Sequence, residues 1–380
     1  MICRGFVVLE REMNSSFPRA IRSTISPSSL VFKRPKPPFF AALSRSISVS
    51  SMPTSPNPQI PLFLRPPKFS STLSDLQKWQ EWAKSIALSV GSKFVDIDNG
   101  PDTILLCREL KWLLEDAVED KSTVPELGSA KNGRLVRLKA DIEELYVLWK
   151  QRIEERRPFQ YIVGCEHWRD LILSVQEGVL IPRPETELIV DLVGEVVLEN
   201  KGLGDGIWAD LGTGSGAIAI GIGRILGSGG KVIATDLSPV AASVAAYNVE
   251  RYELQDKVEI RQGSWFEPLD DVKGALVGLV SNPPYIPSHL ILGLQAEVGK
   301  HEPRLALDGG ENGMDDLLHL CKGAALMLKP GGFFAFETNG EKQCEFLADF
   351  LTNKLETSFH NVKVVYDFAG IQRFVTGFHN

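Results

Sequence analysis

The sequence predicts an α/β fold in which helices cover both faces of a mostly parallel sheet, with a small helical domain before it. Two observations support this prediction. Over residues 186–380, short apolar runs of strand length alternate with segments of helical periodicity. Over residues 69–157, apolar residues recur at three- and four-residue steps with few strand signals. The 380 residues have room for both parts and for an extension.

The first segment, residues 1–68, is predicted to be a targeting extension. It is rich in Ser, Pro and Arg, and its ten Lys and Arg against two Glu give a net charge of +8. Such a composition cannot bury enough apolar area to offset the entropy of ordering it, so we expect disorder. The Ser and Arg bias is typical of a transit peptide, and high Ser and Pro content favours the chloroplast. The alternatives are a mitochondrial presequence and a disordered tail on a cytosolic protein.

Residues 69–157 are predicted to form the helical domain. Segments 73–87, 106–118 and 142–149 show the helical periodicity, and Gly- and Asn-containing breaks separate them. Their aromatic side chains are most simply explained as core residues.

Residues 158–185 are predicted to form a β-hairpin linker. The stretches YIVG and HWRDLILS predict two strands with a glycine turn, and a Pro-rich elbow follows at 181–187.

The remainder, residues 186–380, is predicted to be the catalytic domain. Its helices and strands alternate, which favours parallel pairing with helices on both faces of the sheet. The tail predicts an antiparallel terminal pair. In order, we expect a helix at 185–199, a strand at 207–212, a helix at 217–226, a strand at 231–236, a helix at 239–252, strands at 257–263 and 276–281, a helix at 316–328, and strands at 331–337, 363–370 and 372–378.

A glycine-rich turn follows the strand that ends at Asp210. Gly212, Gly214 and Gly216 permit a tight turn and close approach of a ligand to the backbone. The helix start after the turn offers free N–H groups. We expect Thr213 and Ser215, the residues between the glycines, to contribute to the same cofactor-binding turn.

Two acids complete the predicted cofactor site. Asp236, at the end of the next strand, can accept both hydroxyls of a ribose, and Asp210 can face a positively charged amino-acid moiety. The G-x-G-x-G spacing is tighter than that of dinucleotide folds. A nucleoside that carries a zwitterionic amino acid therefore fits better than a pyrophosphate does.

The motif Asn282-Pro283-Pro284-Tyr285 comes directly after a predicted buried strand, at the carboxyl edge of the sheet, where ligands bind in such folds. The prolines stiffen the loop and remove two donors. We predict that the Asn282 side-chain oxygen and the Pro283 carbonyl accept the two hydrogens of a planar NH₂ group. Tyr285 can offer an aromatic face to the same group. These residues are the predicted catalytic and substrate-binding set.

The cysteines and histidines show no metal-ligand spacing, so no metal site is predicted. The whole chain has a net charge of −7 and the extension has +8, so the rest of the chain has a net charge of −15. This negative charge disfavours non-specific binding to nucleic acid.

Several segments together resemble the release factor glutamine methyltransferases, the HemK/PrmC family. The glycine turn and the NPPY motif are shared with many other N-methyltransferases, whereas the remaining segments are more specific. The segments are ERRPFQYIVG (155–164), IPRPETE (181–187), DLGTGSGAI (210–218), SNPPYI (281–286), HEPRLALDGGENGMD (301–315) and LKPGG (328–332).

The resemblance covers residues 70–380. It implies a Rossmann-like class I S-adenosylmethionine-dependent methyltransferase fold with a small N-terminal helical domain. It also implies N5-methylation of the glutamine in the GGQ loop of peptide chain release factors, and hence a role in translation termination, here in an organelle.

The family resemblance also assigns roles to residues. The segment 212–216 would hold the methionine moiety, Asp236 the ribose and Trp265 the adenine region, while Asn282 would touch both cofactor and target amide. The Pro182–Glu187 elbow would border the site, and the helical domain would dock the release factor. The family often has an acid before Trp265, where this chain has Ser264.

Two other hypotheses remain open from the sequence. The NPPY grip would also suit the exocyclic NH₂ of a flipped-out base, as in an adenine N6-type or rRNA methyltransferase. A degenerate binding protein without activity is the non-enzymatic alternative. We expect a protein substrate, no membrane association and no direct nucleic-acid binding.

Overall fold

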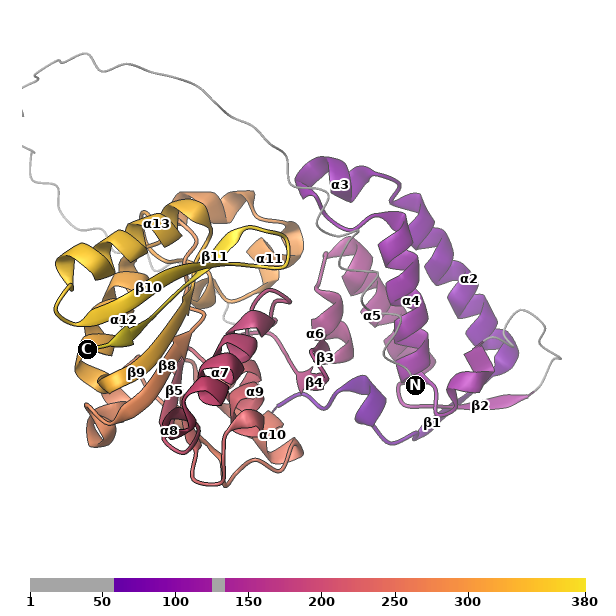
Figure 1. Cartoon of the computed structure of the whole chain (residues 1–380). Coiled ribbons are helices and arrows are strands. Elements are labelled where there is room, and N and C mark those ends of the chain that lie inside the picture. Colours follow the sequence, from indigo (N-terminus) through magenta and orange to yellow (C-terminus); the bar gives the residue numbers. More distant parts are fainter. Residues whose placement is uncertain (1–57, 125–133) are drawn as a thin grey trace, which may run out of the picture. The chain divides into compact units, whose positions relative to one another are not determined.

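The computed structural model describes residues 58–124 and 134–380 (Figure 1). Most of the predicted extension lies outside the described residues, but its last part does not. Leu62 lies in a 3₁₀ turn, Leu62–Leu64, and is fully buried, and the Gln59 amide donates to Gln176 Oε1 at 2.6 Å. The predicted boundary at residue 68 is therefore wrong, because the folded part includes residues that were assigned to the extension.

Four helices form the core of the helical domain: α2 (Leu73–Ser89), α3 (Lys93–Asp98), α4 (Thr103–Ala117) and α5 (Ile142–Glu154). The fully buried indoles of Trp79 and Trp149 lie in their shared core, and Trp149 Nε1 donates to the Ala83 carbonyl at 2.9 Å. The side chains of Thr72 and Asp102 cap the first turns of α2 and α4.

The sequence did not reveal a two-stranded antiparallel sheet in this domain. It pairs β1 (Phe69–Thr72) with β2 (Leu135–Leu138), and the two strands are more than sixty residues apart in the sequence. Strands of four residues are too short to show a clear alternation, so only the tertiary pairing defines them.

The linker contains the predicted hairpin, β3 (Cys165–Trp168) and β4 (Leu171–Ser174), but its turn was assigned wrongly. YIVG is not a strand: Phe159–Val163 forms the short helix α6, which Gly164 ends with a φ of 78°. The chain instead reverses between β3 and β4 at Arg169, which has a φ of 53°.

The main sheet has seven strands in the order β10-β11-β9-β8-β5-β6-β7. Four neighbouring pairs are parallel, and β11 runs antiparallel to both β9 and β10, as predicted for the tail. The strands are β5 (Ile207–Leu211), β6 (Lys231–Asp236), β7 (Val258–Gln262), β8 (Leu276–Ser281), β9 (Leu328–Glu337), β10 (Phe359–Tyr366) and β11 (Gln372–His379).

Two hydrophobic clusters show that helices cover both faces of this sheet. Trp208 of β5 points into a cluster with α7, α9 and α10, whereas its neighbours Ala209 and Leu211 belong to a cluster with α12 and α13. The helices are α7 (Glu187–Glu199), α8 (Lys201–Gly204), α9 (Ala217–Ile225), α10 (Pro239–Arg251), α11 (Ala296–His301), α12 (Asp315–Met327) and α13 (Glu341–Asp349). Shorter turns are η3 (Glu267–Val272), η4 (Ser288–Gly293), η5 (Arg304–Ala306) and η6 (Phe350–Lys354).

The strand order reverses at β5, which lies between β6 and β8. The connections from β5 and from β8 leave the sheet toward opposite faces, and this leaves a crevice at the carboxyl ends of the two strands. The two sequence motifs of interest both start there.

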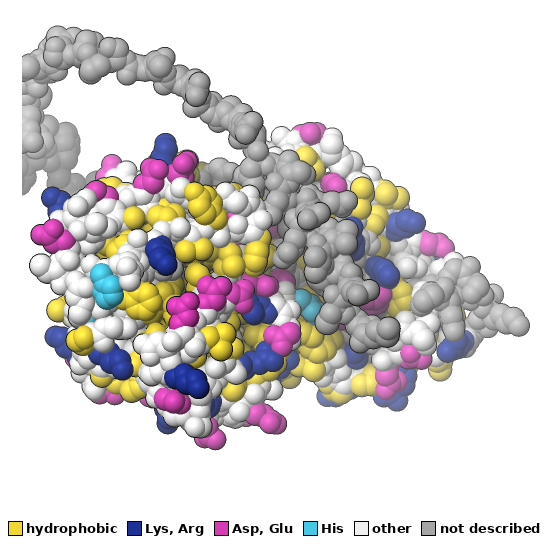
Figure 2. Space-filling model, viewed as in Figure 1, with side chains coloured by type: hydrophobic (Ala, Val, Ile, Leu, Met, Phe, Trp, Pro, Cys, Tyr) yellow, Lys and Arg dark blue, Asp and Glu magenta, His cyan; other side chains and the backbone are white. Residues whose placement is uncertain are grey.

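The charges of the described residues are mixed on the surface. On the face shown in Figure 2, Lys and Arg side chains are scattered among Asp and Glu and do not gather into one patch. No helix among the described residues combines the length and apolar character needed to span a bilayer.

Buried ion pairs join the helical domain to α11. Arg152 of α5 binds Glu109 Oε2 at 2.7 Å and Glu297 Oε1 at 2.9 Å, and Arg156 binds Glu297 Oε2 at 2.5 Å and Asp98 Oδ1 at 3.0 Å. Burial of these charges is tolerated because each guanidinium faces two carboxylates.

We therefore predict that Glu297→Ala destabilises the protein by about 3–5 kcal/mol, since it leaves two buried guanidinium groups each short of a partner. Denaturant unfolding measures this change. The control Lys78→Ala removes an exposed ion pair with Asp75 and is expected to leave the unfolding midpoint unchanged. Equal effects of the two variants would contradict a stabilising role for the buried cluster.

Candidate functional site

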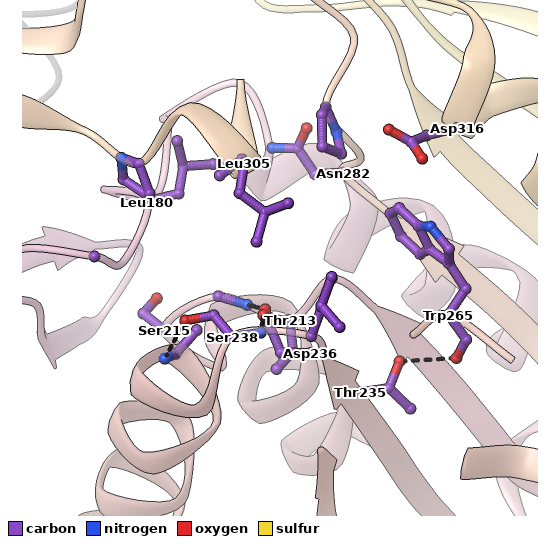
Figure 3. A pocket seen from close by; sticks show the side chains of 18 of the residues that line it. Leu180, Thr213, Ser215, Thr235, Asp236, Ser238, Trp265, Asn282, Leu305 and Asp316 are labelled. Carbon is purple, nitrogen blue, oxygen red and sulfur yellow. Dashed lines mark hydrogen bonds between the residues drawn. The ribbon is translucent and has the colours of Figure 1, made fainter. Parts of the chain in front are cut away.

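A cavity of about 240 Å³ lies in the crevice at the carboxyl edge of the sheet. Figure 3 shows Leu180, Leu305 and Asn282 on one side of it, with Thr213, Ser215, Asp236 and Ser238 opposite. Its lining comes from four segments of the sheet edge, two covering segments and one residue of α12: Gly178, Leu180, Pro182, Thr186, Gly212, Thr213, Gly214, Ser215, Ala217, Thr235, Asp236, Leu237, Ser238, Ala241, Gly263, Ser264, Trp265, Asn282, Pro284, Pro303, Leu305, Ala306 and Asp316.

The predicted glycine turn forms the floor of the cavity. Gly212, Gly214 and Gly216 all have positive φ values, of 73°, 58° and 84°, which disfavour side chains. Gly216 does not line the cavity: it caps α9, and a Cβ there would lie 3.3 Å from Ala245 of α10. Four of the five predicted turn residues, 212–215, therefore reach the ligand space, and the fifth allows the helix to pack.

Asp210 lies below the turn and not in the cavity wall. Its Oδ2 accepts hydrogen bonds from Thr213 Oγ1 at 2.6 Å and from the Ala219 amide at 3.1 Å, so it holds the turn to the start of α9. Its Oδ1 is buried without a partner among the described residues. Burial raises the pKa of this carboxyl to about 7. The structure thus does not place Asp210 at the cavity surface, where the sequence predicted that it faces a cationic amino-acid moiety.

Asp236 stands at the end of β6 and lines the cavity. Its Oδ2 accepts from the Gly214 amide and its Oδ1 from the Ser238 amide, both at 2.9 Å. Burial raises its pKa, while these two backbone donors act in the opposite sense. Each oxygen retains a lone pair, so the two can still accept from neighbouring hydroxyl groups.

Trp265 closes one end of the cavity with its indole beside Asp316 (Figure 3). Trp265 has an unusual φ of 44°, and its carbonyl accepts from Thr235 Oγ1 at 3.2 Å. A Cβ on Gly212 would lie 3.4 Å from the indole ring, so the glycine permits this close packing. Its predicted role beside an adenine ring suits a flat apolar wall at this place.

Asn282 and Pro284 line the cavity on the opposite side, whereas Pro283 is buried and outside the lining. Tyr285 is also outside the lining. Its hydroxyl donates to Glu337 Oε1 at 3.0 Å, and burial raises its pKa well above the usual value. The structure thus gives Tyr285 a hydrogen bond below the loop and does not place its ring at the cavity surface as predicted.

The Asn282 side chain has a fixed orientation. Its Nδ2 donates to Thr186 Oγ1 at 3.1 Å, and the Thr186 hydroxyl donates to Glu337 Oε2 at 2.7 Å. Because the nitrogen is bound to Thr186, the Asn282 oxygen remains available as an acceptor at the cavity. This is the acceptor that the sequence predicted.

Two covering segments were not assigned individual roles from the sequence. One runs from Gly178 to Thr186, and the other is the segment 303–306, which includes the exposed side chain of Leu305. The resemblance implied that the Pro182–Glu187 elbow borders the site, and Pro182 and Thr186 do line the cavity, whereas Gly178 and Leu180 lie before the elbow and were not predicted. The second segment was signalled only by the resemblance of its HEPRLALDGG block.

A buried carboxylate joins these two segments. Glu302 Oε2 accepts from the Ile181 amide at 3.1 Å, and its Oε1 accepts from Arg183 Nη2 at 2.6 Å. Glu302 immediately precedes the segment 303–306, so this contact holds both sides of the cover together.

The residues fit S-adenosylmethionine as cofactor. The turn at 212–215 can approach its methionine part, Asp236 its ribose and Trp265 its adenine, and the group supplies an electrophilic methyl on a sulfonium. The structural observations behind this fit are the positive φ values of Gly212 and Gly214, which let a ligand approach the backbone, and the two Asp236 oxygens at the cavity.

The raised pKa of Asp210 gives a pH-dependence of stability. A carboxyl with a folded pKa near 7, against 3.8 unfolded, contributes stability at low pH that is lost as the pH rises through 7. In the cofactor-free Asp210→Asn variant, the fall in unfolding free energy between pH 5 and pH 8 is expected to shrink by about 2–3 kcal/mol. Denaturant titrations at both pH values test this, with the exposed Asp270→Asn as control. An unchanged pH-dependence in Asp210→Asn would contradict the assignment.

Asp236→Ala is expected to weaken binding of S-adenosylhomocysteine about 10–100-fold, because charged acceptors of hydroxyl groups are lost. Calorimetric titration measures this, and the exposed Asp256→Ala serves as control. Binding within twofold of wild type would show that Asp236 does not hold the ribose.

The chain is similar to known methyltransferases. Residues 184–282 match the family described as "Ribosomal protein L11 methyltransferase (PrmA)". The catalytic domain of hMettl16, solved with an RNA hairpin, is 15% identical, with a TM-score of 0.44 and coverage of 66% of this chain and 86% of that chain.

The similarity to curated relatives extends over both domains. The release factor glutamine methyltransferase of Synechocystis sp. is 37% identical over 305 residues, covering 80% of this chain and 95% of the relative. Those of Thermosynechococcus vestitus and Gloeobacter violaceus are 36% and 43% identical, and cover 79% and 63% of this chain and 97% and 80% of the relatives. With its sheet order and cofactor site, the chain belongs to the release factor glutamine methyltransferase family and is an S-adenosylmethionine-dependent methyltransferase.

Proposed function

We propose that this enzyme methylates N5 of the glutamine in the GGQ loop of an organellar peptide chain release factor, and so acts in translation termination. The main support is the orientation of the Asn282 side chain. Its nitrogen donates to Thr186, and its oxygen is left as an acceptor at the cavity. The names of the relatives, which are 36–43% identical over 241–305 residues, support the same substrate.

The chemistry explains why an acceptor is needed. The lone pair of an amide nitrogen is delocalised into its carbonyl, so the nitrogen is a weak nucleophile. A hydrogen bond from its NH₂ group to the Asn282 oxygen raises the electron density on nitrogen and orients it. The Pro283 carbonyl, predicted as a second acceptor, belongs to a buried residue outside the cavity lining. Well-oriented groups can gain about 7–11 kcal/mol from positioning. The methylated nitrogen loses its proton readily, so the site needs no strong base.

The charge distribution supports a protein substrate over a nucleic acid. The chain outside the extension carries −15, and Lys and Arg are scattered on the face shown in Figure 2. Tight binding to nucleic acid depends on several neutralised phosphates, which this surface does not favour.

The direct test is transfer of labelled methyl to a recombinant organellar release factor and to the same factor with its loop glutamine changed to alanine. We expect label on the first and none on the second. Label on the altered factor, or label on RNA or DNA added in parallel in place of the release factor, would contradict the assignment of glutamine as the substrate.

Asn282→Ala is expected to lower kcat at least a hundredfold, because the acceptor for the target amide is lost. The fold should remain intact, as measured by thermal unfolding. The exposed Asn312→Ala, outside the cavity lining, is the matched control and should retain wild-type turnover. A near-normal rate in Asn282→Ala would contradict the mechanism.

We further propose that the enzyme acts in the chloroplast, with the mitochondrion as the alternative. The net charge of +8 and the Ser and Pro content of residues 1–68 support this. Removal of the presequence should leave Gln59 in place, because Ser174 Oγ donates to its carbonyl at 2.8 Å and its amide binds Gln176.

Residues 1–57 fused to a fluorescent protein are expected to direct it to chloroplasts, and the N-terminal residue of the imported enzyme is expected to lie before Gln59. Microscopy and N-terminal sequencing test the two points. Diffuse cytosolic fluorescence would contradict organelle targeting, and mitochondrial fluorescence would select the alternative.

A further inference from the structure

A buried carboxylate that does not touch the cavity lies behind the acceptor side chain. Glu337 is the last residue of β9 and is fully buried. Because β8 and β9 are parallel neighbours, with Ser281 opposite Phe336, their carboxyl ends bring Asn282 and Glu337 to the same edge. Thr186, 3% exposed at the start of α7, lies between the two side chains.

We propose that Glu337 is a positioning residue for the methyl transfer: through Thr186 it holds the Asn282 oxygen toward the target amide. This inference rests on the proposed glutamine methylation and adds a group that acts on it from outside the cavity.

The argument follows from donors and acceptors. The Thr186 hydroxyl has one hydrogen, and it is donated to Glu337 Oε2 at 2.7 Å. Toward Asn282, Thr186 can then only accept, and it does so from Nδ2 at 3.1 Å. An ionised carboxylate is an acceptor only, so it enforces this direction. The amide oxygen of Asn282 must consequently face away from Thr186.

Protonation of Glu337 reverses the chain of donors. A protonated Oε2 donates to Thr186, whose own hydrogen can then turn to the Asn282 oxygen. Rotation of the amide would present its NH₂ group to the NH₂ of the substrate, and two donors do not bind each other. Asn282, Thr186 and Glu337 therefore favour binding of the target amide when Glu337 is ionised, and they oppose it when Glu337 is protonated.

The surroundings of Glu337 bring the pKa of its carboxyl close to neutral pH, so that its charge state can change within the pH range of an activity assay. Burial raises its pKa to about 7, and the hydrogen bonds from Thr186 and Tyr285 act in the opposite sense. The charged groups that face it from other elements are Glu185, beside Thr186, and Arg373 of β11. The Tyr285 hydroxyl occupies Oε1 at 3.0 Å, which leaves Oε2 for Thr186.

Three variants test the relay with full-length enzyme, a recombinant release factor and saturating S-adenosylmethionine. Glu337→Gln mimics the protonated acid, because its amide can donate to Thr186. Thr186→Val removes the middle hydroxyl, and Thr186→Ser keeps it. At pH 8 we expect kcat to fall at least tenfold in Glu337→Gln and Thr186→Val, and to stay within threefold of wild type in Thr186→Ser.

The pH profile separates positioning from a merely structural role. Wild-type kcat is expected to fall as the pH drops through about 7, and Glu337→Gln is expected to lack this limb. Asp210 contacts Thr213 and Ala219 and not Asn282, and saturating cofactor separates kcat from changes in cofactor affinity. Affinity of Glu337→Gln for S-adenosylhomocysteine should stay within twofold, because Glu337 does not line the cavity.

The outcomes are distinct. Wild-type kcat in Glu337→Gln at pH 8, or an unchanged acidic limb in that variant, overturns the relay. If thermal unfolding shows that Glu337→Gln does not fold, the comparison of Thr186→Val with Thr186→Ser tests the relay instead. Equal activity of these two variants overturns the relay. Failure of the wild-type enzyme to methylate the release factor overturns the proposed function, and the relay with it.

Discussion

The site depends on the pairing of β5 with β8 at the carboxyl edge of the sheet. Leu211 is the direct partner of Ser281, and Ser281 Oγ donates to the Leu211 carbonyl at 2.6 Å. The next residue on one strand begins the glycine turn, and the next on the other is Asn282. A parallel pair in register thus sets the cofactor turn and the amide acceptor side by side, although they are seventy residues apart in the chain.

This edge holds an unusual number of buried carboxylates. Asp210 and Glu337 are fully buried and Asp236 is half-buried, and burial raises the pKa of each. Burying a charge costs stability unless donors surround it. The donors here are backbone amides and hydroxyl groups, so the acids fix the glycine turn and the Asn282 side chain at the same time. Burial of these carboxylates lowers the stability of the protein, but it holds the side chains of the site in place before a substrate binds.

The cover of the cavity is held by charges from outside the main sheet. Glu302 binds both the amide of Ile181 and the guanidinium of Arg183, and Glu297 on the preceding helix receives Arg152 and Arg156 from the helical domain. The segment 296–306 is therefore bound to the helical domain at one end and lines the cavity at the other.

Local patterns in the sequence were sufficient for the order of the strands β5 to β11, for four of the helices between them, α7, α9, α10 and α12, and for the turn at 212–216, because apolar periodicity and positive-φ glycines are properties of short segments. The helices α8, α11 and α13 were not predicted. The acceptor at Asn282 could be predicted in the same way. The two-stranded sheet β1–β2 and the turn at Arg169 could not, since each depends on contacts with distant residues.

Tertiary structure alone decided that Tyr285 turns to Glu337, that Asp210 lies beneath the cavity, and that Thr186 and Glu337 stand behind Asn282. A hydrogen bond between residues about 100 or 150 positions apart leaves no periodic mark in a chain, and only folding brings its donor and acceptor together.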